Sequence, residues 1–239
     1  MKRIICILLS TAVLLCLFGC SSKSGEAASA GQSQSSGSAP DENQPSQEAE
    51  PEVKEEETVF ELQRGTWDES RKNFINEVTG LKVTITVSDT YVASADEELA
   101  ANFLGDSSID LTSWTAEDLK TQISIPELEL VDPFRGSNIR VMYENLKAEN
   151  AVGVGEYAYL DAVLAGLRQN HEDISFQEVY DLELSSHTYK AIDVFYSSSD
   201  FVVQQTLAVR DLGDYMTIVI FTDLNDRENF DHMILLFNQ

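Results

Sequence analysis

Two short runs near residue 80 have the alternating pattern of a half-buried strand. In Leu81–Val87, every second position from Val83 to Val87 holds valine or isoleucine, with threonine between them. A period of two is typical of a β-strand that buries one face. The preceding run, Asn73–Val78, is joined to it through Thr79-Gly80, so the pattern predicts an antiparallel strand pair.

The second half of the chain predicts one long helix followed by a series of strands. Leu160, Val163, Leu164 and Leu167 recur at helical spacing, which predicts an amphipathic helix over 156–169. Short turns separate the apolar runs that follow, and such turns indicate antiparallel neighbours. The predicted strands are Phe176–Leu184, Tyr189–Tyr196, Phe201–Arg210 and Tyr215–Thr222. We expect the last to be covered on both faces, because it is apolar at nearly every position.

Shorter elements complete the predicted order. A closing helix over 226–237 would bury Phe230, Ile234 and Phe237, with Asn225 and Glu228 as a capping box. The other predictions are a helix capped by Ser94 or Asp96 and ended by Gly105, a helix over 116–122 behind Thr115, and a strand pair at 127–132 and 139–145. This order predicts one α+β domain over 59–239, with an antiparallel sheet sandwiched between helices.

The first twenty residues have the pattern of a secretory signal. Two cations precede an apolar run from Ile4 to Phe18, which is shorter than the roughly 20 residues that cross a bilayer. The end of this run, Leu17-Phe18-Gly19-Cys20, resembles the lipobox of bacterial lipoproteins. The resemblance implies cleavage of residues 1–19 and acylation of Cys20, which anchors the mature chain to the extracellular face of the cell membrane. An ordinary signal peptide with a chance cysteine is the alternative.

Residues 20–58 have the composition of a tether. Serine, glycine, alanine, glutamine, proline and glutamate dominate, and Val53 is the only branched apolar residue from 21 to 57. Such a segment buries too little surface to offset the entropy of ordering it. We therefore expect a disordered acidic tether with a mean span of about 35 Å. It serves as a stalk for the folded domain, with a spacer of unselected length as the alternative.

The charge and the cysteine content exclude several classes of protein. A formal net charge of -25 repels nucleic acid and anionic lipid, so we expect no nucleic acid partner. Contact with the bilayer must then come from the acylated Cys20. Cys6 and Cys16 lie in the predicted signal, so the folded part has no thiol. This excludes a disulfide framework, a cysteine nucleophile and a cysteine-ligated metal.

Several short motifs are shared with a known family. They are Arg64-Gly65-Thr66-Trp67-Asp68, Glu77-Val78-Thr79-Gly80-Leu81, Asp96-Glu97-Glu98-Leu99, Ile139–Leu146, Tyr159-Leu160 and Asp214-Tyr215-Met216. Together they resemble small lipoproteins of Gram-positive anaerobes with a PsbP-like fold, and the resemblance spans most of 64–237 while departing between 105 and 130. It implies an α/β/α sandwich that binds partners or assists assembly. It supplies no catalytic residues.

The sequence contains no catalytic motif with the required spacing. His171, His187 and His232 are not spaced as metal ligands. Gly153-Val154-Gly155 fits a dinucleotide fingerprint only loosely, because no strand leads directly into it. The acidic stretch from Asp223 is better explained by helix capping than by a calcium loop. We therefore predict no catalytic site, no metal and no cofactor, and we interpret the acidic pairs Glu97/Glu98 and Glu127/Glu129 as solvated faces.

Trp67 and Trp114 are the candidates for partner contact, since both large rings stand in polar surroundings. Closure of the core is the alternative role. We expect a membrane-anchored extracellular lipoprotein with a monomeric domain, acting as a non-catalytic binding or assembly module for a cell-envelope protein. The first alternative is a small-ligand or cation-binding lipoprotein for uptake or sensing, which a deep pocket with convergent polar groups favours. The second is a cell-envelope hydrolase, which two acids in one cleft favour.

Overall fold

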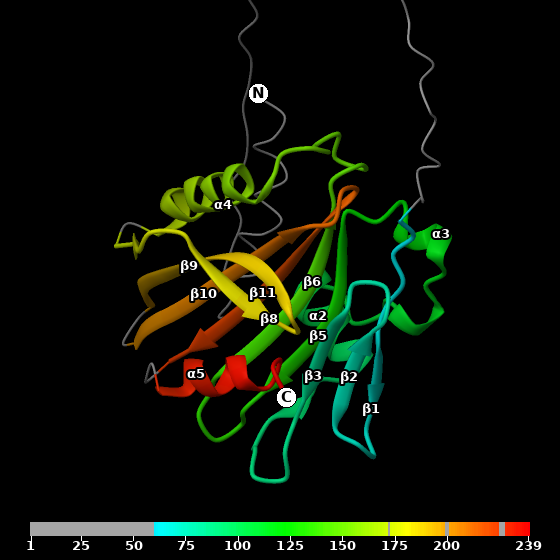
Figure 1. The fold of residues 1–239 in the computed structure, drawn as a ribbon, viewed down its shortest axis with the longest axis horizontal. Coiled ribbons are helices and arrows are strands. Elements are labelled where there is room, and N and C mark those ends of the chain that lie inside the picture. The colour runs from blue at the N-terminus through cyan, green and yellow to red at the C-terminus, as the bar shows by residue number, and fades with distance from the viewer. Residues whose placement is uncertain (1–59, 172, 199–200, 225–227) are drawn as a thin grey trace, which may run out of the picture. The chain divides into compact units, whose positions relative to one another are not determined.

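An eight-stranded antiparallel sheet forms the centre of the molecule (Figure 1). The computed structural model describes residues 60–171, 173–198, 201–224 and 228–239, so the predicted signal and tether lie outside the described residues. The strand order is β4 (Val92–Ala93), β5 (Ser124–Val131), β6 (Asn138–Asn145), β11 (Tyr215–Asp223), β10 (Phe201–Asp211), β9 (His187–Ser198) and β7 (Ser175–Phe176), while β8 (Tyr180–Leu184) also pairs with β9. These pairings confirm the predicted antiparallel succession of the last strands.

The middle strands are buried on both faces, as the apolar run of the last strand predicts. All nine residues of β11 are buried. They lie between β6 and β10, with Val219 opposite Val141 on one side and Ala208 on the other. Side chains of alternate β11 residues therefore enter two separate cores, one on each side of the sheet.

Helices cover one face of this sheet. The long helix α4 (Glu156–Asn170) buries Leu160, Val163, Leu164 and Leu167, which confirms the predicted stripe. It packs with α2 (Asp96–Leu104) over Leu207, Ile218 and other sheet residues. Burial of these leucine and isoleucine side chains contributes about 1.5–3 kcal/mol each, so this face supplies a large part of the core.

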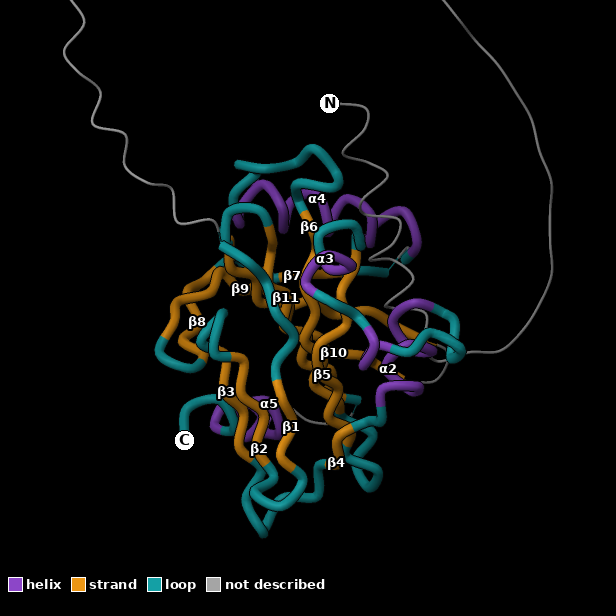
Figure 2. Tube along the Cα trace, turned by 90° about the vertical axis from the view of Figure 1, so that its right-hand side faces the viewer, coloured by secondary structure: helices purple, strands orange, loops and turns teal. Residues whose placement is uncertain are grey.

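The opposite face is covered by a second, smaller sheet together with a helix. The small sheet consists of β1 (Thr66–Asp68), β2 (Asn73–Asn76) and β3 (Leu81–Thr84), and the helix is α5 (Glu228–Leu235). Phe74, Phe221 and Phe237 are among the residues that form this second core. The α+β class and the layered sandwich are thus as predicted, with a three-stranded sheet sharing one outer layer. Figure 2 shows β1 and α2 on opposite sides of β5.

Two of the shorter predicted elements, a strand and a helix cap, differ from the structure. The predicted strand Phe176–Leu184 is interrupted, because Gln177 donates its backbone N–H to Asp193 and the chain then rejoins β9 one step away. Phe176 consequently packs on the helix-covered face, and Leu182 on the other. The helix cap is Ala95 rather than Ser94 or Asp96. Ser94 instead donates its hydroxyl to Glu129.

The remaining short helices are also modified. Thr115 caps the predicted second helix, but this helix, α3, spans only Ala116–Leu119, and a 3-10 turn, η1 (Leu111–Ser113), precedes it. On α5 the buried residues include Phe230 and Met233, whereas Ile234 is only partly buried, and Phe237 is buried just after the helix ends. The predicted capping box lies outside the described residues at Asn225. Among the described residues, no helix is long and apolar enough to cross a membrane.

Candidate functional site

A cavity of about 490 Å³ opens between β1, the beginning of α2 and the turn η1, with β5 as its floor. Both tryptophans of the chain, Trp67 and Trp114, line it. Its polar lining includes Arg64, Asp96 and Glu127. The two tryptophans that the sequence suggests as candidates for partner contact therefore line the same pocket. Their contact with a partner stays a prediction.

A β-bulge places Glu127 beside this cavity. The register between β5 and β6 shifts between Pro126 and Leu128, so Glu127 is the extra residue that has no partner across the ladder. Its side chain is fully buried. Oε1 accepts hydrogen bonds from the Gly65 backbone N–H at 2.6 Å and from the Asn76 amide at 2.7 Å. The prediction that Glu127 lies on a solvated face is wrong, because donors from the small sheet cover it.

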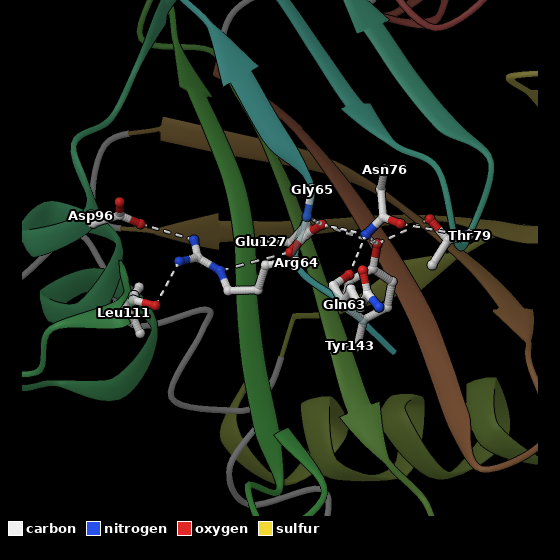
Figure 3. Close-up of polar contacts among 9 residues, drawn as sticks. All are labelled: Gln63, Arg64, Gly65, Asn76, Thr79, Asp96, Leu111, Glu127 and Tyr143. Carbon is white, nitrogen blue, oxygen red and sulfur yellow. Dashed lines mark hydrogen bonds and ion pairs between the residues drawn. The ribbon is translucent and has the colours of Figure 1, made fainter. Parts of the chain in front are cut away.

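Arg64 occupies the polar centre of the site (Figure 3). Its two terminal nitrogens donate to the Leu111 carbonyl at 3.0 Å and to Asp96 Oδ1 at 2.9 Å. Its Nε lies 3.9 Å from Glu127 Oε2, which makes an ion pair with no hydrogen bond. The guanidinium thus connects the segment that leads into β1 with η1, α2 and β5, and it stands between the two acids of the pocket.

Burial governs the ionisation of the inner part of the site. Loss of hydration raises the pKa of Glu127 from its ordinary 4.5 to about 7, although the donors from Asn76 and Gly65 and the charge of Arg64 lower it. Burial also raises the pKa of Tyr143 well above its ordinary value, and the nearby Glu127 carboxyl acts in the same direction. Tyr143 is therefore a neutral phenol, and Glu127 titrates near neutral pH.

Glu129, two residues further along β5, is also buried and has a different role. It accepts hydrogen bonds from the Ser94 hydroxyl, the Asn102 amide and Arg140 Nε at 2.7–2.8 Å. The prediction of a solvated face is wrong here too, since α2 covers this side of β5. These bonds fasten α2 to the sheet, so Glu129 stabilises the wall of the pocket. Glu97 and Glu98 are exposed, as predicted.

The other sequence candidates lie apart from the pocket. His171 ends α4, His187 begins β9, and His232 on α5 pairs with Asp89 at 2.7 Å. Gly155 precedes α4 with a positive φ of 68°, in an antiparallel setting that does not fit a dinucleotide site. Within the described ranges, no group of three histidine, cysteine or acidic side chains could hold a metal ion.

Sequence reasoning did not identify Arg64, Asp96 or Glu127 as site residues. Arg64 and Asp96 stand 32 positions apart, and Asn76 and Glu127 stand 51 apart. Two signals were available: Arg64 begins the first shared motif, and Asp96 begins the third. Neither signal indicates that the two motifs meet, because their contact depends on how the small sheet packs over β5.

Comparisons with known proteins leave the family open. No family model and no curated protein matches the chain. Similar solved structures include LpqN, involved in cell envelope biogenesis of Mycobacterium tuberculosis, with 10% identity over 66% of this chain and 80% of that chain and a TM-score of 0.36. Another is PA94, a protein of unknown function from Pseudomonas aeruginosa, with 11% identity and a TM-score of 0.29. The match covers 40% of this chain and 62% of the length of PA94. Both TM-scores are too low to support an argument, so the PsbP-like resemblance stays a prediction.

Proposed function

We propose that this protein is a non-catalytic binding lipoprotein, anchored through acylated Cys20 on the extracellular face of the cell membrane, and that the pocket at Arg64 holds a small ligand. The pocket carries this proposal. It measures about 490 Å³, which lies within the roughly 300–1,000 Å³ of small-molecule sites. Arg64, Asp96 and two tryptophans converge on it from separate elements. Convergent polar groups in a pocket favour the ligand-binding alternative over an assembly module that contacts a protein.

A hydrolase is the second candidate, because Asp96 and Glu127 line the same pocket. A pair of carboxyl groups serves hydrolysis when both reach the scissile bond from opposite sides. Here Glu127 is fully buried, and Arg64 interacts with both acids. A guanidinium held between the two acids fits a site that binds a ligand better than one that transfers protons to it.

Tryptophan fluorescence tests the binding proposal, because both tryptophans of the chain line the pocket. The mature lipoprotein, in a detergent without a sugar headgroup, is titrated with low-mass fractions of a bacterial cell-envelope extract. We expect a saturable change in emission with at least one fraction, weakened in Arg64→Lys, which keeps the charge but loses the planar fork of donors. Constant emission with every fraction contradicts the proposal. Mass spectrometry of the incubated fraction should recover the ligand chemically unchanged. Recovery of its hydrolysis products would instead support the hydrolase.

The anchor is tested by labelling cells with palmitate. We expect Cys20→Ala to abolish incorporation of the label, because the acylated sulfur is then absent. Cys16→Ala is the matched control, since this cysteine stands four positions earlier within the apolar run of the signal. It should retain the label. Equal labelling of the two variants contradicts lipidation at Cys20.

A further inference from the structure

The charges around the pocket favour a neutral ligand. Arg64 is paired with Asp96 at 2.9 Å and lies 3.9 Å from Glu127, so an anion would meet two acids beside one cation. The whole chain carries a formal net charge of -25, which repels anions further. A cation would instead approach the Arg64 guanidinium, whose charge opposes it at short range. Glu127 is buried behind Arg64, so a ligand meets the Arg64–Asp96 pair, whose opposite charges offset one another, and the long-range attraction of the acidic chain for a cation is screened by salt.

The aromatic and polar groups together indicate the chemistry of the ligand. Trp67 and Trp114 provide large ring surfaces, whose negative faces attract weakly positive C–H groups. The indole N–H of Trp67 is directed to Glu69 at 2.7 Å, so its ring offers carbon surface rather than a donor. Arg64 has five N–H donors. Two are used, and the Nε–H is buried toward Glu127, which leaves one N–H on each terminal nitrogen, beside the Asp96 side chain that is 35% exposed.

We infer that the pocket at Arg64 binds a neutral sugar ring, an inference that rests on the ligand-binding function proposed above. A hydroxyl group both donates and accepts, so neighbouring hydroxyls of a sugar match a guanidinium N–H next to a carboxylate. The C–H face of the same ring stacks on tryptophan. Glu127 acts from below as a positioning residue, because it is buried and lies next to the Arg64 Nε. Asp96, Arg64, Trp67 and Trp114 are assigned to direct contact.

The inference is tested with three trisaccharides that differ in charge. The mature lipoprotein, in a detergent without a sugar headgroup, is titrated with chitotriose, which is neutral, with the glucosamine trimer, which is cationic, and with trigalacturonate, which is anionic. Tryptophan emission is recorded. We expect saturable binding of chitotriose and affinities about tenfold weaker for both charged trimers. Repeating the titration with the monosaccharide N-acetylglucosamine shows whether the ligand is a free sugar or part of a glycan chain. Tighter binding of chitotriose than of the monosaccharide indicates a chain.

Variants locate the binding. Trp114→Ala should weaken chitotriose binding about tenfold, monitored by calorimetry and by the emission of Trp67. Phe134→Ala removes a ring that is 82% exposed and does not line the pocket, so it should leave the affinity unchanged.

Two outcomes overturn the inference. One is binding of a charged trimer as tight as that of chitotriose, and the other is an equal loss of chitotriose affinity in both variants. If no saccharide binds but an extract fraction changes the tryptophan emission, the inference of a sugar ligand is wrong and the proposed binding function stands. If neither the saccharides nor the extract fractions change the emission, the inference and the proposed function are both wrong.

Discussion

Glu127→Ala is expected to reduce the free energy of unfolding by about 3 kcal/mol at pH 5. The backbone N–H of Gly65 and the amide of Asn76 both donate to Oε1 of this buried side chain. Alanine removes the acceptor of the Gly65 N–H and leaves the buried Asn76 amide with the Gln63 carbonyl at 2.8 Å and the Tyr143 hydroxyl at 3.2 Å. Loss of an acceptor costs about 1–3 kcal/mol for each donor affected. Urea denaturation at pH 5 measures the effect, because there the wild-type carboxyl is protonated in the folded state and most of the stability that its raised pKa contributes is still present.

Glu77→Ala is the matched control for this prediction. Glu77 is an exposed glutamate in the turn between β2 and β3, and it follows Asn76 directly in the chain. Its replacement should change the free energy of unfolding by less than about 0.5 kcal/mol. If the two alanine variants are equally stable, the donors around Glu127 find other partners, and Glu127 does not hold the small sheet to β5.

Regular periodicity allowed most of the large sheet and the long helix to be predicted. The runs that became β9, β10 and β11 are long, and Leu160 and its partners recur at helical spacing in α4. The same reasoning fails where a local irregularity changes the register. Phe176 and Tyr180 occupy alternate positions of one run, yet the interruption at Gln177 sends Phe176 to one core and Tyr180 to the other. The sequence does not reveal this interruption, because Phe176 and Tyr180 keep the even spacing of one strand face.

The candidate site was predictable only in part. Trp67 and Trp114 stand out as large rings in polar surroundings, and the structure places both at one pocket. Glu127 and Glu129 alternate with Leu128 and Leu130, a pattern that is typical of a strand with one wet face. Instead, donors beside the small sheet cover Glu127, while Glu129 is covered on the α2 side of β5. A buried acid with distant partners and a solvated acid have the same local sequence pattern, so only tertiary structure separates them.

The ionisation of Glu127 predicts a pH dependence of stability. Burial raises the pKa of its carboxyl to about 7 in the folded state, above the 4.5 of the unfolded chain. Between these values the folded state binds the extra proton, so stability contributed by this group falls as the pH rises from 4.5 to 7 and is constant beyond. The difference between the two pKa values corresponds to about 3 kcal/mol. Glu127 therefore loses its contribution to stability as the pH rises, whereas a salt-bridged carboxylate loses its contribution as the pH falls.

Glu127→Gln isolates this contribution from the many other acids of the chain. Glutamine keeps an acceptor for Gly65 and Asn76 but does not titrate, so its cost is independent of pH. We expect the free energy of unfolding of the wild type, measured relative to the Gln variant in urea, to fall by about 3 kcal/mol from pH 4.5 to pH 8. A constant difference would show that the carboxyl ionises as in the unfolded chain. The Arg64 guanidinium would then stabilise the carboxylate enough to offset its burial, and the pocket would carry a fixed negative charge below Arg64 throughout this range.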